Sequence, residues 1–265
     1  MKKSIDYSLI TESPGHKATK EQVERLGQRY WFARNCGDCQ RVLEVGCGTG
    51  MGLNYLTRAG KSWVVGGDVD PGNLAMARRL LSSNANIALV RLNAQDMPFR
   101  SACFDKVVSF EAIYYFPDPT RFVSEVVRLL RPGGLFVLGT VNCAWPDFHI
   151  SPYTYRYFNN LELVRLLSPH FSSVEMYGGF LAQEKGARAK MLSVLKRVAI
   201  AGNLIPGSLQ ARALLKRMFI GPLEDLPTAV TDKIVPGTAP EHLDTETMET
   251  RHKILYAVAQ KTIRV

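Results

Sequence analysis

The chain has 265 residues, 46% of them hydrophobic, and a formal net charge of +9. Its length and composition suit one large α/β domain, and they exclude a membrane-spanning helix because no stretch of about 18 apolar residues occurs. The excess of positive charge favours anionic partners such as nucleic acid, anionic lipid or phosphorylated substrates, but does not choose among them.

The first half of the chain predicts strands and helices in alternation. Helices are expected at residues 19–36, 50–59, 73–82 and 119–130, the first of them capped by Thr19, and strands at 41–46, 62–67, 87–92, 104–110 and 135–140. The segment Arg131-Pro-Gly-Gly134 is expected to break the chain before the last of these strands. Apolar strands that alternate with helices over short connections predict a doubly wound, Rossmann-like, mostly parallel α/β sheet.

The pattern changes after residue 141. An aromatic loop is expected at residues 142–158, then a helix at 159–168 and strands at 171–177 and 253–261, which makes seven strands in all. The expected organisation has three parts. They are an N-terminal helical segment (1–37), a core (38–180 and 252–265) and a helical or irregular insertion between the last two strands (181–251).

Residues 184–220 of the insertion carry eight basic residues against one acidic residue, with apolar residues at helical spacing. Two basic amphipathic helices are the simplest interpretation. They are either a cap packed on the sheet or a surface that contacts an anionic membrane or a lipid-linked, phosphorylated acceptor. In residues 221–250 acidic residues outnumber basic ones, and this segment is expected to form an irregular lid against these helices.

The five cysteines form an odd and scattered set, which is a poor disulfide framework and favours a reducing compartment. Cys36 and Cys39 are spaced as half of a zinc site or a redox pair, but no second pair follows. We therefore interpret them as ordinary thiols at a helix end and expect no metal site. The protein is expected in the cytoplasm, with the basic helices as the feature that would bring it to the inner membrane face.

The strand at 41–46 runs into a glycine-rich loop, Val42-Leu-Glu-Val-Gly-Cys-Gly-Thr-Gly50. Glycines let the backbone approach a ligand closely, as in sites for dinucleotides and for S-adenosylmethionine. The glycines at 46, 48 and 50 do not fit the dinucleotide spacing G-x-G-x-x-G, and no Lys-Ser/Thr follows as in a P-loop. Asp68, at the end of the next strand, is a candidate to accept hydrogen bonds from ribose hydroxyls, and its alternative role is that of a turn residue.

Three further segments occur in order downstream: Asn93-Ala-Gln-Asp-Met-Pro-Phe99, Phe104-Asp-Lys-Val-Val-Ser109 and Arg128-Leu-Leu-Arg-Pro-Gly-Gly134. With the glycine loop they resemble the class I S-adenosylmethionine-dependent methyltransferases, small-molecule branch, with a methyltransferase type 11-like domain. The resemblance covers roughly residues 40–140. It implies an enzyme that uses S-adenosyl-L-methionine as cofactor.

The resemblance also implies roles for single residues. Asp68 would bind the ribose, Val69 would flank the adenine and Ala94 would offer its backbone amide to the adenine edge. Asn93 stands where the family usually has Asp, and its carbonyl can still accept a bond from the adenine amino group. Phe110 would lie beside the cofactor. The methionine part would be held by Glu44, Gly46, Cys47, Gly48 and Gly50.

The acceptor must lie near the carboxyl ends of the fourth and fifth strands, where a general base could act. Five residues are candidates for this base: Glu111, Tyr114, Tyr115, Asp147 and His149. Of these, Glu111, Tyr115 and His149 are chosen as the catalytic residues. The alternative role of Glu111 is a solvated helix cap, and that of His149 is a structural loop residue. The N-terminal segment is expected to close over the cofactor, and its candidate pocket residues are Tyr7, His16, Tyr30 and Trp31.

The leading function is methyl transfer to an O or N of a small molecule, such as a sugar, a glycolipid intermediate or a secondary metabolite. A nucleic-acid methyltransferase is the second hypothesis, but Ser109-Phe-Glu-Ala-Ile-Tyr114 lacks the N/D-P-P-Y/F/W-type motif of base-amino methylating enzymes. A nucleic-acid partner is therefore not expected. A non-catalytic S-adenosylmethionine-binding protein is the third hypothesis, and a dehydrogenase is a remote fourth.

Overall fold

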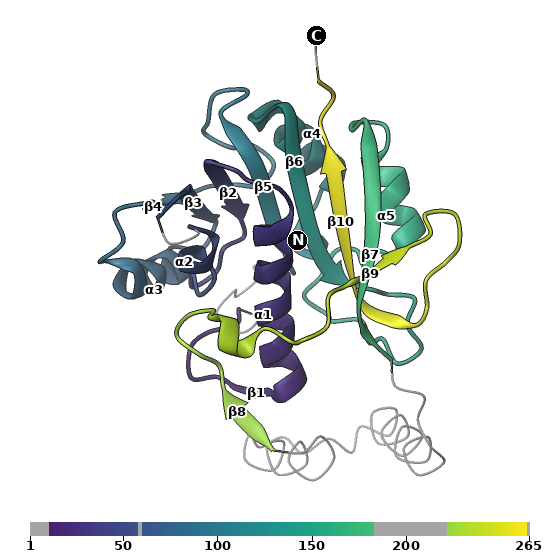
Figure 1. The fold of residues 1–265 in the computed structure, drawn as a ribbon, viewed down its shortest axis with the longest axis horizontal. Coiled ribbons are helices and arrows are strands. Elements are labelled where there is room, and N and C mark those ends of the chain that lie inside the picture. Colours follow the sequence, from purple (N-terminus) through teal and green to yellow (C-terminus); the bar gives the residue numbers. More distant parts are fainter. Residues whose placement is uncertain (1–10, 58–59, 183–221, 264–265) are drawn as a thin grey trace.

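The computed structural model describes residues 11–57, 60–182 and 222–263, and its centre is one sheet with strand order β4-β3-β2-β5-β6-β10-β7-β9 (Figure 1). Neighbours from β4 to β6 pair in parallel, whereas β10 is antiparallel to both β6 and β7. The mostly parallel Rossmann-like fold is thus confirmed. The strands are β2 (Arg41–Val45), β3 (Trp63–Asp68), β4 (Ile87–Arg91), β5 (Phe104–Phe110), β6 (Leu130–Val141), β7 (Ser173–Leu181), β9 (Glu241–Leu243) and β10 (His252–Gln260).

Helices cover both faces of the sheet (Figure 1). Side chains that alternate along a strand point to opposite faces, so Val42 packs in the cluster with α1, α2 and α3, while Leu43 packs in the cluster with α4 and α5. The same alternation separates Val108 from Val107 on β5. The helices are α1 (Lys20–Asn35), α2 (Leu53–Leu56), α3 (Pro71–Leu81), α4 (Pro119–Leu129) and α5 (Asn160–Leu167), with short 3-10 turns η2 (Ile113–Tyr115) and η3 (Asp232–Ile234).

Three predicted elements differ from the structure. The helix expected at 50–59 is reduced to the four residues of α2, which starts beyond the left-handed Gly50. The strand expected at 135–140 starts earlier, at Leu130, but the chain is irregular at 131–134 as expected: Gly133 has φ +75°, and the pairing with β5 shifts in register there. The sheet has an eighth strand, β9, whose three residues are too few to give a sequence pattern.

Helix α1 is fixed at both ends. The predicted cap at Thr19 is confirmed, and Thr19 and Gln22 form a reciprocal capping box. At the other end the buried Lys106 ammonium donates to the carbonyl oxygens of Ala33 (2.7 Å) and Gly37 (3.1 Å). These carbonyls are unpaired at a helix end, so Lys106 satisfies them while β5 holds the helix against the sheet.

Residues 222–238 pack against the half of the molecule that carries α1 and the glycine loop, whereas β9 pairs with β7 at the opposite side of the sheet. The strand β8 (Leu223–Asp225) pairs with β1 (Lys17–Thr19) just ahead of α1. Val230 is buried, and its backbone N–H donates to the carbonyl of Met51 (2.9 Å) beside the glycine loop. We expected this segment to pack against two basic helices at 184–220, but residues 183–221 lie outside the described residues. What the structure describes is a brace on α1 and α2.

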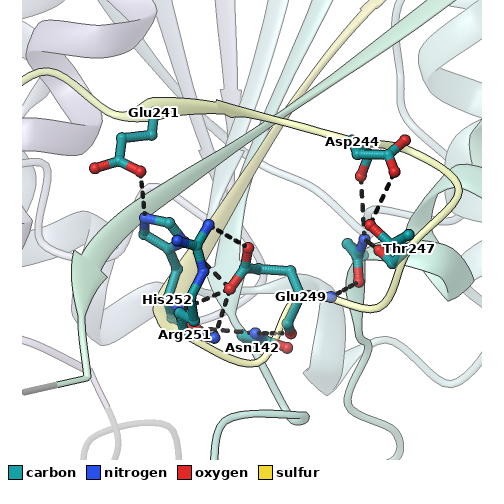
Figure 2. Close-up of polar contacts among 8 residues, drawn as sticks. Asn142, Glu241, Asp244, Thr247, Glu249, Arg251 and His252 are labelled. Atoms are coloured by element: carbon teal, nitrogen blue, oxygen red, sulfur yellow. Dashed lines mark hydrogen bonds and ion pairs between the residues drawn. The ribbon is translucent and has the colours of Figure 1, made fainter. Parts of the chain in front are cut away.

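A buried polar network joins the last turn of the chain to the sheet (Figure 2). The Asn142 amide, at the end of β6, donates to the carbonyls of Glu249 (2.8 Å) and His252 (2.9 Å). The His252 ring is buried between the carboxylates of Glu249 (3.3 Å) and Glu241 (3.4 Å). Buried polar groups need such partners, so the network fixes where β10 enters the sheet between β6 and β7. None of the helices in the described ranges is long and apolar enough to cross a membrane.

Candidate functional site

A cavity of about 350 Å³ lies at the carboxyl ends of β2, β3 and β5, between the glycine loop and α1. This is the edge where ligands bind in doubly wound sheets, and the volume lies in the range of small-molecule sites. Nearly all the cofactor residues expected from the sequence line it: Glu44, Gly46, Cys47, Gly48, Asp68, Val69, Asn93, Ala94 and Phe110.

The glycine loop has the backbone shape that the sequence requires. Gly46, Gly48 and Gly50 all have positive φ, between +54° and +78°. A Cβ on Gly46 would lie 2.8 Å from the Cβ of Ala112, so a side chain there would push the loop away from the residues after β5. Cys47 turns its buried side chain toward β3 and leaves its backbone on the cavity side.

Asp68 holds the loop as well as facing the cavity. One carboxylate oxygen accepts from the Gly48 backbone N–H (2.8 Å), and the other from the Asp70 backbone N–H (2.9 Å). Burial raises the pKa of Asp68, while these bonds oppose the shift. The oxygen that binds Asp70 also accepts a longer bond from the Asn73 side-chain amide (3.4 Å). Of the about four acceptor positions of a carboxylate, one is therefore left for a ribose hydroxyl, and a second hydroxyl would have to replace Asn73.

The predicted adenine contacts also line the cavity. Val69 is exposed to it, and Ala94 is buried in its wall. The side-chain Oδ1 of Asn93 accepts from the Gln95 backbone N–H (3.0 Å). A ligand must therefore share that oxygen or bind the side-chain NH₂ group.

Glu44 lies at the start of the glycine loop with one oxygen in use. Its Oε1 accepts from the Tyr30 hydroxyl (2.6 Å), and Oε2 is buried without a hydrogen-bond partner among the described residues. Burial raises the pKa of Glu44 to about 7. An unpartnered buried carboxylate oxygen is costly unless a ligand completes it, and the ammonium of the cofactor's methionine part is a suitable donor. The residues present therefore fit S-adenosylmethionine.

The acceptor side of the cavity is formed just after β5. Glu111 is held at φ +51°, a conformation that costs energy for a residue with a side chain and that is found at functional sites. Its carboxylate accepts from the Tyr114 hydroxyl (2.9 Å), and burial raises its pKa. Tyr115 packs edge-on against Tyr114 and lines the same cavity, and burial raises its pKa to about 12.

The other candidates are dispersed. His149 is exposed and does not line the cavity, although the loop that carries it contacts η2 through a hydrogen bond from the Tyr155 N–H to the Tyr114 carbonyl (2.9 Å). Of the N-terminal candidates Tyr30 lines the cavity, whereas His16 and Trp31 do not. Tyr7 lies outside the described residues.

Sequence reasoning missed the wall contributed by α1, by the segment before it and by β10. Gln22, Arg25 and Arg29 project from α1 at spacings of three and four residues, and this polar stripe on a largely buried helix was the available signal. Tyr256 belongs to an apolar strand, where nothing marked it. The missed lining residues include Thr11, Glu12, Gln22, Arg25, Arg29, Ile254 and Tyr256.

Comparison with known families and proteins agrees with this geometry. The family model described as "Methyltransferase domain" matches residues 43–138. A probable S-adenosylmethionine-dependent methyltransferase of Mycolicibacterium smegmatis is 32% identical over 161 residues, 56% of this chain and 61% of that protein. The phthiotriol/phenolphthiotriol dimycocerosates methyltransferase of Mycobacterium leprae is 40% identical over 96 residues (36% and 35%). The fatty-acid O-methyltransferase of Mycolicibacterium smegmatis is 39% identical over 99 residues (37% and 36%). The matches thus span less than two thirds of each relative.

Solved structures support the fold. A Thermotoga maritima S-adenosylmethionine-dependent methyltransferase, described as a possible histamine N-methyltransferase, aligns with a TM-score of 0.57 over 92% of both chains at 13% identity. Phosphoethanolamine N-methyltransferase 2 of Haemonchus contortus, with S-adenosylhomocysteine bound, gives 0.57 over 94% of this chain and 54% of its own, at 18% identity. With the glycine loop and Asp68, the family match identifies residues 43–138 as a class I S-adenosylmethionine-dependent methyltransferase domain.

Proposed function

We propose that the protein transfers a methyl group from S-adenosylmethionine to an O or N of a small molecule, with lipid-type acceptors the first to test. The observation that carries the proposal is Glu111, a partly buried carboxylate in the same cavity as the glycine loop. The names of two relatives, which act on fatty acids and on phthiotriol or phenolphthiotriol dimycocerosates, support the choice of acceptor class.

The roles of the residues follow from their chemistry. When bound, the cofactor supplies an activated methyl group on a sulfonium. Glu44 would accept from its ammonium and Asp68 from a ribose hydroxyl, so that both ends are anchored. Fixing two reactants in line can contribute on the order of 7 kcal/mol through proximity.

Glu111 would act on the acceptor. A carboxylate whose pKa is raised by burial is a stronger base than one in water, so Glu111 would take the proton of an attacking hydroxyl or orient an amine. The Tyr114 hydroxyl keeps the carboxylate in place. Tyr115 and Phe110 give the acceptor an aromatic wall on the cavity side.

The first experiment is calorimetry of the wild-type chain with S-adenosylmethionine and with NAD. We expect binding of S-adenosylmethionine alone. Binding of NAD without S-adenosylmethionine would overturn the proposal and favour a dehydrogenase.

The second experiment uses cofactor labelled in the methyl group and panels of fatty acids, lipid alcohols, sugars, amines and generic RNA. We expect label in a small molecule. Glu111→Gln should lower turnover about 100-fold and leave cofactor affinity within about twofold. Label only in RNA would favour the nucleic-acid hypothesis. Cofactor binding without transfer to any panel would favour a non-catalytic binding protein.

A further inference from the structure

Two arginines on α1, Arg25 and Arg29, contribute to a cavity wall that is otherwise rich in carboxylates. They are the only cations among the described residues that line the cavity, which also carries Glu12, Glu44, Asp68 and Glu111. The carboxylates suit the sulfonium and ammonium of the cofactor. Its one anionic group, the methionine carboxylate, needs a cation, and the glycine loop supplies none.

Arg29 lies near the Glu44 end of the cavity and has an N–H donor without a partner among the described residues. Its side chain is only 11% exposed, and its Nε is buried without a hydrogen-bond partner among the described residues. Its guanidinium carbon lies 5.5 Å from the centre of the Tyr30 ring, and the Tyr30 hydroxyl donates to Glu44. One unpartnered donor and one unpartnered acceptor, Arg29 Nε and Glu44 Oε2, therefore flank the same tyrosine.

We propose that Arg29 binds the carboxylate of the cofactor's methionine part, so that Arg29 and Glu44 together recognise its zwitterionic end. This assignment rests on the proposed function. Arg29 would bind the ligand's carboxylate and Glu44 its ammonium. The site would therefore favour a ligand with the intact amino-acid end over nucleosides that lack either charge.

Arg25 also has a buried Nε without a hydrogen-bond partner among the described residues, so position, and not the unpaired donor alone, distinguishes the two arginines. Nη2 of Arg25 pairs with Glu21, and its guanidinium carbon lies 5.6 Å from the centre of the Phe180 ring, one helical turn away from Arg29. Arg29 lowers the pKa of Glu44 against the larger opposing effect of burial, and Arg25 has no comparable influence there. Arg25 therefore serves as the matched control.

The Glu12 carboxylate does not prevent this role. It pairs with Nη2 of Arg29, which leaves Nε available. A guanidinium offers five N–H donors in a planar fork, so it can bind two carboxylates along different edges. Glu12 would then hold the guanidinium in the plane that the cofactor needs.

The test compares S-adenosylmethionine with its decarboxylated form, which differs by that carboxylate alone, using calorimetry on the full chain. Wild type should prefer S-adenosylmethionine about thirtyfold, the range of a charge-assisted hydrogen bond. Arg29→Met should abolish this preference by weakening S-adenosylmethionine binding, with decarboxylated cofactor within about threefold of wild type. Arg25→Met should keep the preference. Arg29→Lys should retain part of it and covers the case in which Arg29→Met does not fold, judged by its thermal transition.

The outcomes separate two failures. If wild type binds neither ligand, the proposed function fails. A second failure is possible when wild type binds S-adenosylmethionine. If Arg29→Met and Arg29→Lys keep the full preference, or weaken the binding of both ligands equally, Arg29 does not bind the carboxylate. Loss of the preference in Arg25→Met alone would move the role to Arg25 and overturn the assignment.

Discussion

The two walls of the cavity are built in different ways. The glycine-loop wall comes from short segments that directly follow β2 and β3, and its shape is local: positive φ at glycines and an Asp68 carboxylate that binds the Gly48 N–H. The α1 wall comes from a helix that is distant along the chain, and residues 222–238 pack against that helix. One wall is specified by neighbouring residues, and the other only by tertiary packing.

Tyr30 joins the two walls. Its ring belongs to α1, its hydroxyl donates to Glu44 on the other wall, and its face packs against Phe110 with ring centres 5.1 Å apart. Changes at this junction should therefore affect both walls, whereas changes elsewhere should affect one.

The largest effect is expected from Gly52→Ala. A Cβ on Gly52 would lie 1.9 Å from the Tyr30 ring, so the ring must leave its site and lose its bond to Glu44. We expect the free energy of unfolding to fall by about 3 kcal/mol, the upper range for overpacking, and cofactor affinity to fall with it. Urea unfolding and calorimetry measure the two quantities.

Gly237→Ala is the matched control for this prediction. No heavy atom lies within 4 Å of its added Cβ, so stability should change by less than about 0.5 kcal/mol. An equal effect of both substitutions would mean that the clash with Tyr30 is not the cause of the loss in Gly52→Ala.

Glu44→Gln should give a pH-dependent effect. Because burial raises the pKa of Glu44 to about 7, the folded state holds this proton more tightly than the unfolded chain. Its contribution to stability is full below about pH 4.5 and is lost as the pH rises to about 7. Glu44→Gln has no such proton to lose. The free energy of unfolding of the variant, relative to wild type, should therefore be up to about 3 kcal/mol higher at pH 8 than at pH 4.

Urea unfolding at the two pH values tests this difference. Cofactor affinity should fall about tenfold in the same variant, because the ammonium loses its carboxylate. A stability difference that is equal at pH 4 and pH 8 would contradict the raised pKa. The expected pH dependence would instead mean that ionised Glu44 lowers the stability of the ligand-free protein.

Asp68→Ala affects the glycine-loop wall alone. We expect cofactor affinity to fall at least tenfold, or about 1.4 kcal/mol, because the ribose loses its acceptor. Asp70→Ala is the control. It removes the cap on α3, where Asp70 accepts from the Asn73 N–H (2.8 Å), and should cost about 1 kcal/mol of stability with affinity unchanged. Equal affinity losses would remove Asp68 from the ribose role.

The same contrast explains what the sequence could predict. Glu44, the loop glycines and Asp68 sit at strand ends, where a local motif places them with no knowledge of the rest of the fold. Arg29 and Tyr256 reach the cavity only because α1 and β10 pack against it. Tyr256 carries no local signature, and Arg29 is marked only by the polar stripe on α1. β9 was missed for a similar reason, since its pairing with β7 depends on a turn held by Asn142 and Glu249 (Figure 2).

The smallest effect is expected at His149, which the sequence offered as a catalytic candidate. His149 is exposed and away from the cavity wall, while Tyr115 lines it. With the acceptor identified by labelled cofactor, His149→Ala should change turnover by less than about twofold, since a general base contributes 10²-fold or more. Tyr115→Phe, which removes one hydroxyl at the acceptor wall, should have the larger effect. A tenfold loss in His149→Ala would mean that the aromatic loop at 142–158 reaches the reacting atoms. The acceptor site would then have a third wall, built like the α1 wall from packing at a distance.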